Sequence, residues 1–369
     1  MTLKVAIVGC GKIADGHVGE IQKLPKLARV VAVCDTEPLM AEQLANRFDI
    51  AGIYDDFSAM LTTERPDVVH IATPPRSHLS LATEALAAGC HIYVEKPLAP
   101  EHSDTVKLVE RARDTDRKLT AGYSYLFDPP ARQLRQLVAD GALGEIVHLE
   151  TFYGYDLTGP FGSAVLADAN HWVHGLPGQL LQNNIDHMLY KLAEYIDDDE
   201  PDLTAFGMVR RPQRFGDKRD VMADELRVLL RGRRVTATAT FSSFSRPIAH
   251  VLRLYGTRNS ATVDFSARTV VLESTSPLPS ALGRLVPAFQ RSGRLALEGA
   301  RNVASFARSE FHFFAGLNHL IRSFYESILD GGPAPIEDRT LLWTSAIMDR
   351  IFRALDAGGT ADGGNAGGA

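Results

Sequence analysis

The stretch Val8-Gly9-Cys10-Gly11-Lys12-Ile13-Ala14 indicates the fold of the first part of the chain. It follows an apolar run of strand length, residues 3–8, and it precedes a helical pattern. This is the G-x-G-x-x-A form of the dinucleotide-binding fingerprint, in the strand-to-helix position that the fingerprint requires. Gly9 permits the tight turn, Gly11 lets backbone approach a pyrophosphate, and Ala14 lets the helix pack closely on the strand.

Three further residues complete the predicted dinucleotide site. Lys12 and Ile13 begin the helix whose N-terminus would face the phosphates, so we take both as cofactor-binding candidates. Asp35 ends the next predicted strand, residues 29–34, about 20 positions past the fingerprint. An acid at this place binds the ribose hydroxyls of NAD and repels a 2′-phosphate, so the sequence favours NAD and makes NADP less likely as the cofactor.

Apolar runs continue to alternate with helical patterns up to residue 123, which predicts a doubly wound parallel sheet, a Rossmann domain over residues 1–128. The run 67–72 ends in Thr73-Pro74-Pro75-Arg76-Ser77-His78, where two prolines exclude a helix and wrap the chain over the strand end. The run 91–94 ends in Glu95-Lys96-Pro97. Open α/β sheets bind ligands at such strand ends, and a lysine held there can carry a proton.

These motifs, in this order and together with Ala88-Gly89, resemble the Gfo/Idh/MocA oxidoreductases, the family of glucose–fructose oxidoreductase and inositol dehydrogenase. The resemblance runs along nearly the whole chain, and it implies that Lys96 is catalytic. It also makes Thr73, Pro74, His78 and Glu95 candidates for binding the cofactor.

A second domain is expected over residues 129–356, with α+β structure and an open, mostly antiparallel sheet like that of the family. Its strands are predicted at residues 144–152, 225–230, 234–241, 249–255, 261–265 and 269–273. Because an open sheet needs its outer face covered, we expect a homodimer or homotetramer that forms through this sheet. The Gly/Ala-rich tail, residues 357–369, is predicted to be disordered.

A second group of candidate residues lies on a predicted helix of this domain. Family members carry a glycine, then an Asp and, four residues later, a His, and here these positions hold Gly178, Asn183 and His187. Residues i and i+4 share a helix face, so Asn183 and His187 would project together toward Lys96. An amide orients a hydroxyl but exchanges no proton. Lys96 and His187 are therefore the predicted proton carriers, and Asn183 is the predicted orienting group.

Several other residues are candidate substrate contacts. His171 and Trp172 stand in a loop before this helix, where an indole can stack on a sugar face. Tyr125 is a further substrate candidate, beside Lys96, Asn183 and His187. The histidines His171, His174 and His187 lack a carboxylate-rich context, so no metal site is predicted. A loop anchor remains the alternative reading of His171 and Trp172, and a satisfied histidine under a helix that of His187.

Composition limits the class of protein. The chain has 369 residues, 45% hydrophobic and 23% charged, with a net charge of −6, so no basic field favours nucleic acid. Cys10, Cys34 and Cys90 lie in apolar runs and indicate buried free thiols in a reducing, cytoplasmic compartment. The arginine-rich, amphipathic segment 277–316 could lie on an anionic membrane or hold a phosphorylated substrate. Its pattern favours instead a helix that packs on a neighbouring element or subunit and keeps its arginines solvated.

The sequence thus favours an NAD-dependent oxidoreductase that moves hydride between nicotinamide and a secondary alcohol of a sugar, sugar nucleotide or cyclitol. Two alternatives stay open. One is an NAD-dependent redox glycosidase, which cleaves a glycosidic bond through transient oxidation. The other is a non-catalytic sugar or nucleotide sensor of the same fold, an alternative that Asn183 keeps open and that Lys96 argues against.

Overall fold

A computed structural model describes residues 2–210, 213–215, 218–220, 222–274, 280–358 and 361–362. The chain forms two compact units: Met1–Phe127 with Phe313–Ala346, and Asp128–His312 with Ile347–Ala369. Residues 313–346, which the sequence predicts to lie in the second domain, belong to the first unit. Of the tail predicted to be disordered, residues 359–360 and 363–369 lie outside the described residues.

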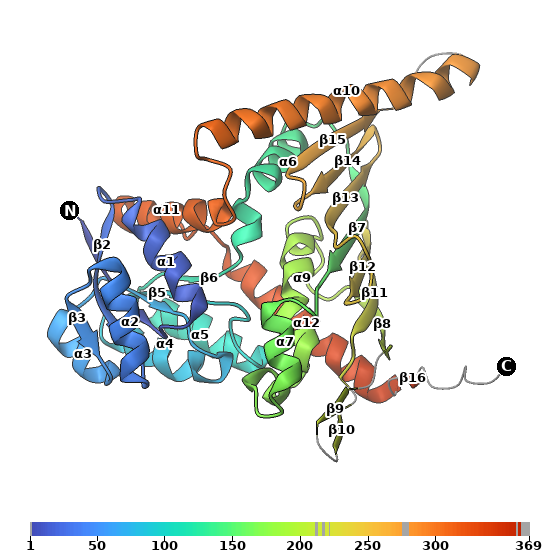
Figure 1. Ribbon diagram of the computed structural model, residues 1–369. Coiled ribbons are helices and arrows are strands. Elements are labelled where there is room, and N and C mark those ends of the chain that lie inside the picture. The colour runs from blue at the N-terminus through green and yellow to red at the C-terminus, as the bar shows by residue number, and fades with distance from the viewer. Residues whose placement is uncertain are drawn as a thin grey trace. The chain divides into compact units, whose positions relative to one another are not determined.

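The first unit is built on a six-stranded parallel sheet of order β3-β2-β1-β4-β5-β6 (Figure 1). Its strands are β1 (Leu3–Val8), β2 (Ala28–Cys34), β3 (Gly52–Tyr54), β4 (Val68–Ile71), β5 (His91–Val94) and β6 (Leu119–Ala121). The central strands are short apolar runs buried on both faces, as parallel strands between helices must be. The strand order reverses between β1 and β4, where such sheets bind ligands. The predicted Rossmann sheet is confirmed.

Helices of the first unit pack around this sheet. They are α1 (Lys12–Gln22), α2 (Pro38–Phe48), α3 (Phe57–Glu64), α4 (His78–Ala87), α5 (His102–Asp114), α11 (Ala315–Asp330) and the first part of α12 (Asp338–Gly358). Helix α11 packs beside α1, and α4 beside α5 (Figure 1). A late segment of the chain therefore completes the first unit.

The second unit holds an eight-stranded sheet of order β15-β14-β13-β7-β12-β11-β8-β16. Its strands are β7 (Ile146–Gly154), β8 (Asp202–Val209), β11 (Glu225–Arg231), β12 (Thr236–Ser242), β13 (His250–Gly256), β14 (Asn259–Asp264), β15 (Thr269–Ser274) and β16 (Ala361–Asp362). Neighbours pair antiparallel, except that β7 pairs parallel with β12 and β8 with β16. A separate hairpin joins β9 (Gln213–Phe215) to β10 (Lys218–Asp220). The predicted open, mostly antiparallel sheet is confirmed.

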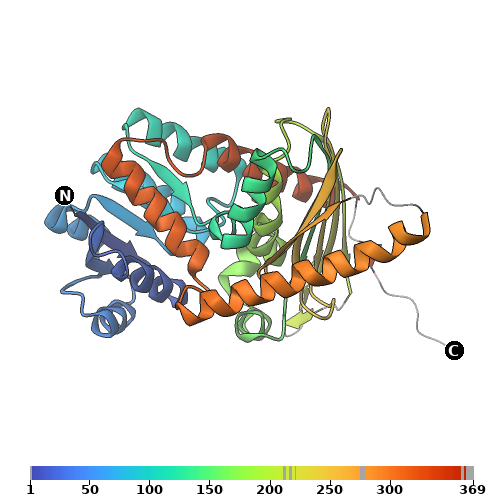
Figure 2. The same ribbon diagram turned by 90° about the horizontal axis from the view of Figure 1, so that it is seen from above.

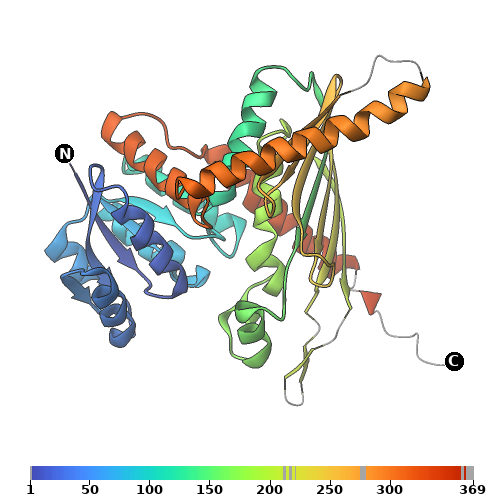
Figure 3. The same cartoon turned by 45° about the horizontal axis from the view of Figure 1, so that its top comes forward.

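The two faces of this sheet differ. Helices α6 (Pro129–Ala139) and α9 (Asp186–Ala193) pack on one face (Figure 3), over buried side chains such as Leu226 and Phe241. The opposite face carries exposed apolar side chains: Phe206 on β8 is 55% exposed and Leu229 on β11 is 51% exposed. Strand alternation puts these two side chains on the same face, because Phe206 pairs with Arg227 and Leu229 with Thr204.

The arginine-rich segment forms one long helix, α10 (Ser280–Ala307), which lies along the β15 side of the sheet (Figure 2). Arg291 pairs with Glu273 of β15, and the amide of Asn302 donates to the carbonyl of Ala267. Phe289 and Val303 are 76% and 70% exposed. The predicted helix packed on a neighbouring element is thus present from residue 280, while residues 277–279 lie outside the described part of the chain. No helix among the described residues has the length and apolar character needed to cross a membrane.

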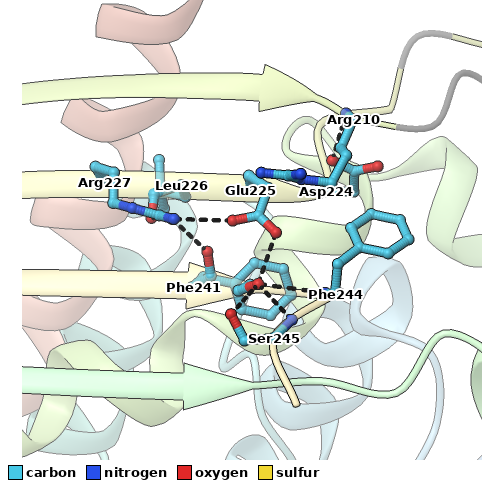
Figure 4. A network of polar contacts seen from close by, with 9 residues as sticks. Arg210, Asp224, Glu225, Leu226, Arg227, Phe241, Phe244 and Ser245 are labelled. Atoms are coloured by element: carbon cyan, nitrogen blue, oxygen red, sulfur yellow. Dashed lines mark hydrogen bonds and ion pairs between the residues drawn. The ribbon is translucent and has the colours of Figure 1, made fainter. Parts of the chain in front are cut away.

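A buried polar network fixes the end of β11 against β12 (Figure 4). Glu225, 3% exposed, accepts hydrogen bonds from the Ser242 hydroxyl at 2.6 Å and from the Arg227 guanidinium at 3.0 Å. The same guanidinium donates to the carbonyls of Leu226 and Phe241, both at 2.9 Å. The network satisfies a carboxylate that the sheet would otherwise bury unpaired.

Candidate functional site

The glycine loop after β1 has the geometry that the fingerprint predicts. Gly9 has a φ of +89° and donates its N–H to the carbonyl of Cys34 at 2.9 Å. A Cβ at this position would lie 2.7 Å from the carbonyl carbon of Ala72 and from Cγ2 of Thr73. Only glycine fits both the dihedral angle and the space.

The start of α1 leaves room for a ligand. Gly11 is the N-cap residue, and no atom lies within 4 Å of the position that its Cβ would take. Ala14 is fully buried against the sheet, while Lys12 is exposed and Ile13 half-buried. The first N–H groups of a helix have no partner within the helix and attract anions. Open space beside them fits the pyrophosphate of a dinucleotide.

Asp35 follows β2 at the same edge of the sheet. Its Oδ2 accepts from the N–H of Cys10 at 2.7 Å, and its Oδ1 accepts from the N–H of Glu37 at 3.0 Å. Each carboxylate oxygen can accept more than one hydrogen bond, so both oxygens keep capacity for ribose hydroxyls. Burial first, and then the Asp35 charge, raise the pKa of the Cys10 thiol to about 12. All three cysteines are buried free thiols, as predicted.

His78 joins the loop after β4 to the loop after β5. Its Nε2 lies 2.8 Å from the carbonyl oxygen of Thr73, and its Nδ1 lies 3.1 Å from those of Pro97 and Leu98. The ring is fully buried, so it supports the backbone of both loops. Pro74 precedes a short 3-10 helix, η1 (Pro75–Ser77), so the expectation that the two prolines exclude any helix there is wrong. A single 3-10 turn tolerates proline at its first position, because no N–H is needed there.

Glu95 and Lys96 stand directly after β5. Glu95 accepts from the N–H of Lys96 at 3.1 Å through Oε2, and its Oε1 lies 3.0 Å from Nε2 of His17. Burial alone would raise the pKa of Glu95, but the hydrogen bond with His17 and the charge of Lys96 lower it. A Cβ on Gly122 would lie 2.7 Å from Oε1, so the carboxylate is confined on that side as well. Lys96 itself is half-buried.

The helix predicted to carry Asn183 and His187 is divided in two. Helix α8 (Gln179–Asn184) ends one residue before Ile185, and α9 begins at Asp186. Asn183 is 7% exposed, and the backbone at Ile185 keeps right-handed helical angles. Gly178 caps α8, and a Cβ there would lie 2.0 Å from Cζ of Phe352. The glycine expected from the family pattern is therefore required by a ring packed against it.

His187 lies in a cluster of aromatic and basic side chains. Its Nδ1 is 2.9 Å from the hydroxyl of Tyr190, and its ring centroid is 5.3 Å from that of Tyr153. Tyr153 packs edge-on against His250, which contacts Nζ of the fully buried Lys191. Burial lowers the pKa of both Lys191 and His250 well below their usual ranges. His187, with 12% of its side chain exposed, and the partly exposed Tyr153 reach the surface from this cluster.

His171 and Trp172 form an aromatic group with Phe161 of α7 (Pro160–Ala167). The His171 and Trp172 rings stack with centroids 5.5 Å apart, at the start of the 3-10 helix η3 (Trp172–Gly175). Phe161 meets both rings edge-on, at 5.5 and 6.3 Å. Tyr125 lies in the first unit, on η2 (Ser124–Phe127). Within the described residues, no cluster of three or more His, Cys, Asp or Glu side chains could hold a metal ion.

Two histidines for which the sequence predicts no role lie in the interior of the first unit. His17 and His70 are fully buried and lie within 3 Å of each other, Nδ1 to Nδ1 at 2.9 Å. His70 stands inside a strand that otherwise reads as apolar, and a titratable residue within such a run is the signal that could have identified it.

Comparison with known proteins finds relatives for the first part of the chain. Residues 3–123 match the model of the family described as "Oxidoreductase family, NAD-binding Rossmann fold". The chain is 36% identical over 144 residues to D-glucoside 3-dehydrogenase of Escherichia coli (strain K12). This alignment covers 39% of this chain and 41% of that protein. The chain is 29% identical over 149 residues to inositol 2-dehydrogenase of Corynebacterium glutamicum (strain R), covering 40% and 44%. The aligned part thus spans about two fifths of the length of each relative.

The whole fold is also similar to solved structures. The WlbA dehydrogenase of Bordetella pertussis, crystallised with NADH and UDP-GlcNAcA, superimposes with a TM-score of 0.78 at 17% identity. The superposition covers 97% of this chain and 96% of that one. The match of residues 3–123 to the Gfo/Idh/MocA family model confirms, over that part of the chain, the resemblance that the sequence motifs predict.

Proposed function

We propose that the protein is an NAD-dependent oxidoreductase acting on a secondary alcohol of a sugar, sugar nucleotide or cyclitol. The observation that carries the proposal is the position of Lys96 directly after β5, in the same parallel sheet whose β1 and β2 ends hold the glycine loop and Asp35. Similarity to a glucoside dehydrogenase and an inositol dehydrogenase supports the substrate class.

Residues of the first unit would hold the cofactor. The N-terminus of α1, with Gly11, Lys12 and Ile13, suits the pyrophosphate, and Asp35 suits the ribose hydroxyls and disfavours NADP. Thr73 and Pro74 would border the cofactor from the β4 end. Bound NAD would supply the hydride acceptor.

The proton of the alcohol needs an acceptor from the chain. Lys96 takes this proton, and the carboxylate of Glu95 beside it stabilises the ammonium that results. His187 shares or relays the proton, and its hydrogen bond with Tyr190 fixes the orientation of the imidazole. Asn183 orients the hydroxyl, while Tyr125, His171 and Trp172 contact the rest of the substrate.

The test is NADH formation over a panel of sugars, glycosides, inositols and nucleotide-linked sugars. NADH production on one class, lost in Lys96→Ala, supports the proposal and identifies the substrate class. Release of an aglycone without net NADH would replace it by a redox glycosidase. Binding of NAD and a sugar with no reaction in either direction would replace it by a sensor.

We also propose that copies associate through the outer face of the eight-stranded sheet. The exposed side chains Phe206 and Leu229 supply an apolar surface of the kind that interfaces cover.

A further inference from the structure

A continuous chain of hydrogen bonds runs through the interior of the first unit and ends at Glu95. Nε2 of His17 on α1 lies 3.0 Å from Oε1 of Glu95. Nδ1 of His17 lies 2.9 Å from Nδ1 of His70 on β4, and Nε2 of His70 lies 2.8 Å from the hydroxyl of Tyr325 on α11. We call these four residues the Glu95–Tyr325 chain. Its members come from α1, β4, α11 and the loop after β5, all of which belong to the first unit.

Aromatic rings enclose the Glu95–Tyr325 chain. His17, His70 and Tyr325 are all fully buried. Tyr93 stacks face to face on His70, with ring centroids 4.6 Å apart, and meets His17 edge-on at 5.0 Å. Charges are costly in such surroundings. Burial accordingly lowers the pKa of His70 well below its usual range and raises that of Tyr325 well above it, so both are neutral at neutral pH.

With His17, His70 and Tyr325 all neutral and Glu95 ionised, one arrangement of protons satisfies every contact. His17 Nε2 must carry a proton and donate it to the carboxylate of Glu95. His17 Nδ1 then accepts from Nδ1–H of His70, and Nε2 of His70 accepts from the hydroxyl of Tyr325. All three donors therefore point toward Glu95. Hydrogen bonds aligned in this way polarise one another and strengthen the last one.

The far side of the carboxylate meets Lys96. Oε2 accepts from the Lys96 N–H, and the attraction of the Lys96 charge helps to lower the pKa of Glu95. Because an electrostatic attraction acts equally on both partners, a carboxylate held ionised favours the protonated amine. We propose that His17, His70 and Tyr325 are positioning residues for the proton step: they hold Glu95 ionised and in place, so that Lys96 can keep the proton of the alcohol. This inference rests on the proposed function.

Tyr325→Phe tests the chain with the smallest change. It removes the donor to His70 and leaves the ring, so Glu95 is held ionised less strongly. We expect kcat to fall about fivefold and the KM for NAD to stay unchanged. The acid limb of the pH profile of kcat/KM should move up by about half a pH unit. Tyr93→Phe is the matched control: its ring stacks on His70, and its buried hydroxyl makes no hydrogen bond with any described residue. Tyr93→Phe should change neither kcat nor the position of the acid limb.

A double-mutant cycle separates this role from a structural one. If the chain acts through the Glu95 charge, Tyr325→Phe has no further effect on kcat in a Glu95→Gln background. If Tyr325→Phe lowers kcat equally in both backgrounds, or lowers only stability, the inference is wrong.

The tautomers provide a measurement that needs no substrate. Nitrogen-15 NMR of the imidazoles at neutral pH should show His17 protonated at Nε2 only and His70 at Nδ1 only, with no titration of His70 near the usual histidine pKa. Other tautomers would overturn the inference, whatever the activity. Turnover lost in Lys96→Ala but unchanged, with an unmoved acid limb, in Tyr325→Phe would overturn the inference and leave the proposed function standing. A wild type that turns over no substrate would overturn the proposed function, and with it the catalytic role of the chain.

Discussion

The carboxylate of Asp35 accepts a hydrogen bond of 2.7 Å from the backbone N–H of Cys10, which ties the end of β2 to the glycine loop after β1. The negative charge that would recognise the ribose is thereby fixed relative to the loop that would recognise the pyrophosphate. Cofactor preference should depend on that charge and hardly on the shape of the side chain.

Asp35→Asn keeps an acceptor for Cys10 and removes the charge. Because the repulsion of a 2′-phosphate is lost together with a charged acceptor for the ribose, we expect the preference for NAD over NADP to narrow by about tenfold or more. Fluorescence titration with both nucleotides measures the two dissociation constants. An unchanged ratio would mean that Asp35 does not read the ribose.

Gly178→Ala should destabilise the second unit by about 2 kcal/mol, because the new methyl group overlaps the Phe352 ring. Chemical denaturation measures the loss, and adding Phe352→Leu should restore part of it. Gly299→Ala on α10 is the control, since nothing lies within 4 Å of its Cβ position. That variant should be neutral or stabilising by up to about 1 kcal/mol. Equal stability of the Gly178 and Gly299 variants would contradict the packing described.

Glu225→Ala should lower the free energy of unfolding by about 2–3 kcal/mol. The change leaves the buried hydroxyl of Ser242 and the Nη2 group of Arg227 without their acceptor. Glu225→Gln retains one acceptor and should cost less. Thermal and denaturant unfolding compare the three proteins. A loss in the Gln variant as large as in the Ala variant would show that the charge, and not the hydrogen bond to Ser242, holds the network together.

Stability should fall as the pH drops below about 6.5, the pKa of an unfolded histidine. His70 in the first unit and His250 in the second both have folded pKa values far below that figure, chiefly because of burial. The unfolded chain then binds protons that the folded chain does not, at a cost of about 1.4 kcal/mol per pH unit for each residue. His70→Gln should reduce the slope of the unfolding free energy against pH, measured by denaturation just below about pH 6.5. The same slope in the variant would mean that His70 is charged in the fold.

Charge on the outer sheet face should disrupt the proposed association. Phe206→Glu or Leu229→Glu places an ion on the surface that we propose to be covered, so we expect the mass in solution to fall toward that of one chain. Analytical ultracentrifugation measures it. Phe289→Glu on the exposed side of α10 is the comparison. A wild type that sediments as a single chain would refute the association.

Local pattern is enough to predict the glycine loop of the first unit and the strands around it. Gly9, Gly11 and Asp35 each need their residue type for a reason confined to one turn or one strand end, and the structure gives each the surroundings expected. Strands β7 and β11 to β15 were likewise predicted, because one buried face makes apolar residues alternate. Strand β8 was missed: apolar residues alternate poorly in it, and Phe206 points to the outer face.

Tertiary relations were beyond the sequence. Tyr325 lies 255 positions from His70, and no spacing rule links them. The ring of Phe352 that requires Gly178 comes from the last helix, α12. For the same reason residues 313–346 are predicted in the second domain, because a helix that returns to complete an earlier unit has no local sequence signal. The division of α8 from α9 at Ile185 has no glycine or proline to announce it.

The central claim is that Lys96 carries the proton of an alcohol oxidised by NAD. The most direct measurement compares wild type with Lys96→Ala at saturating NAD and the best substrate of the panel, alongside NAD affinity by titration. We predict that kcat falls about 10²-fold to 10⁴-fold while the dissociation constant for NAD changes less than about threefold. Retained turnover, or equal losses of turnover and NAD affinity, would contradict the account and leave Lys96 a structural residue.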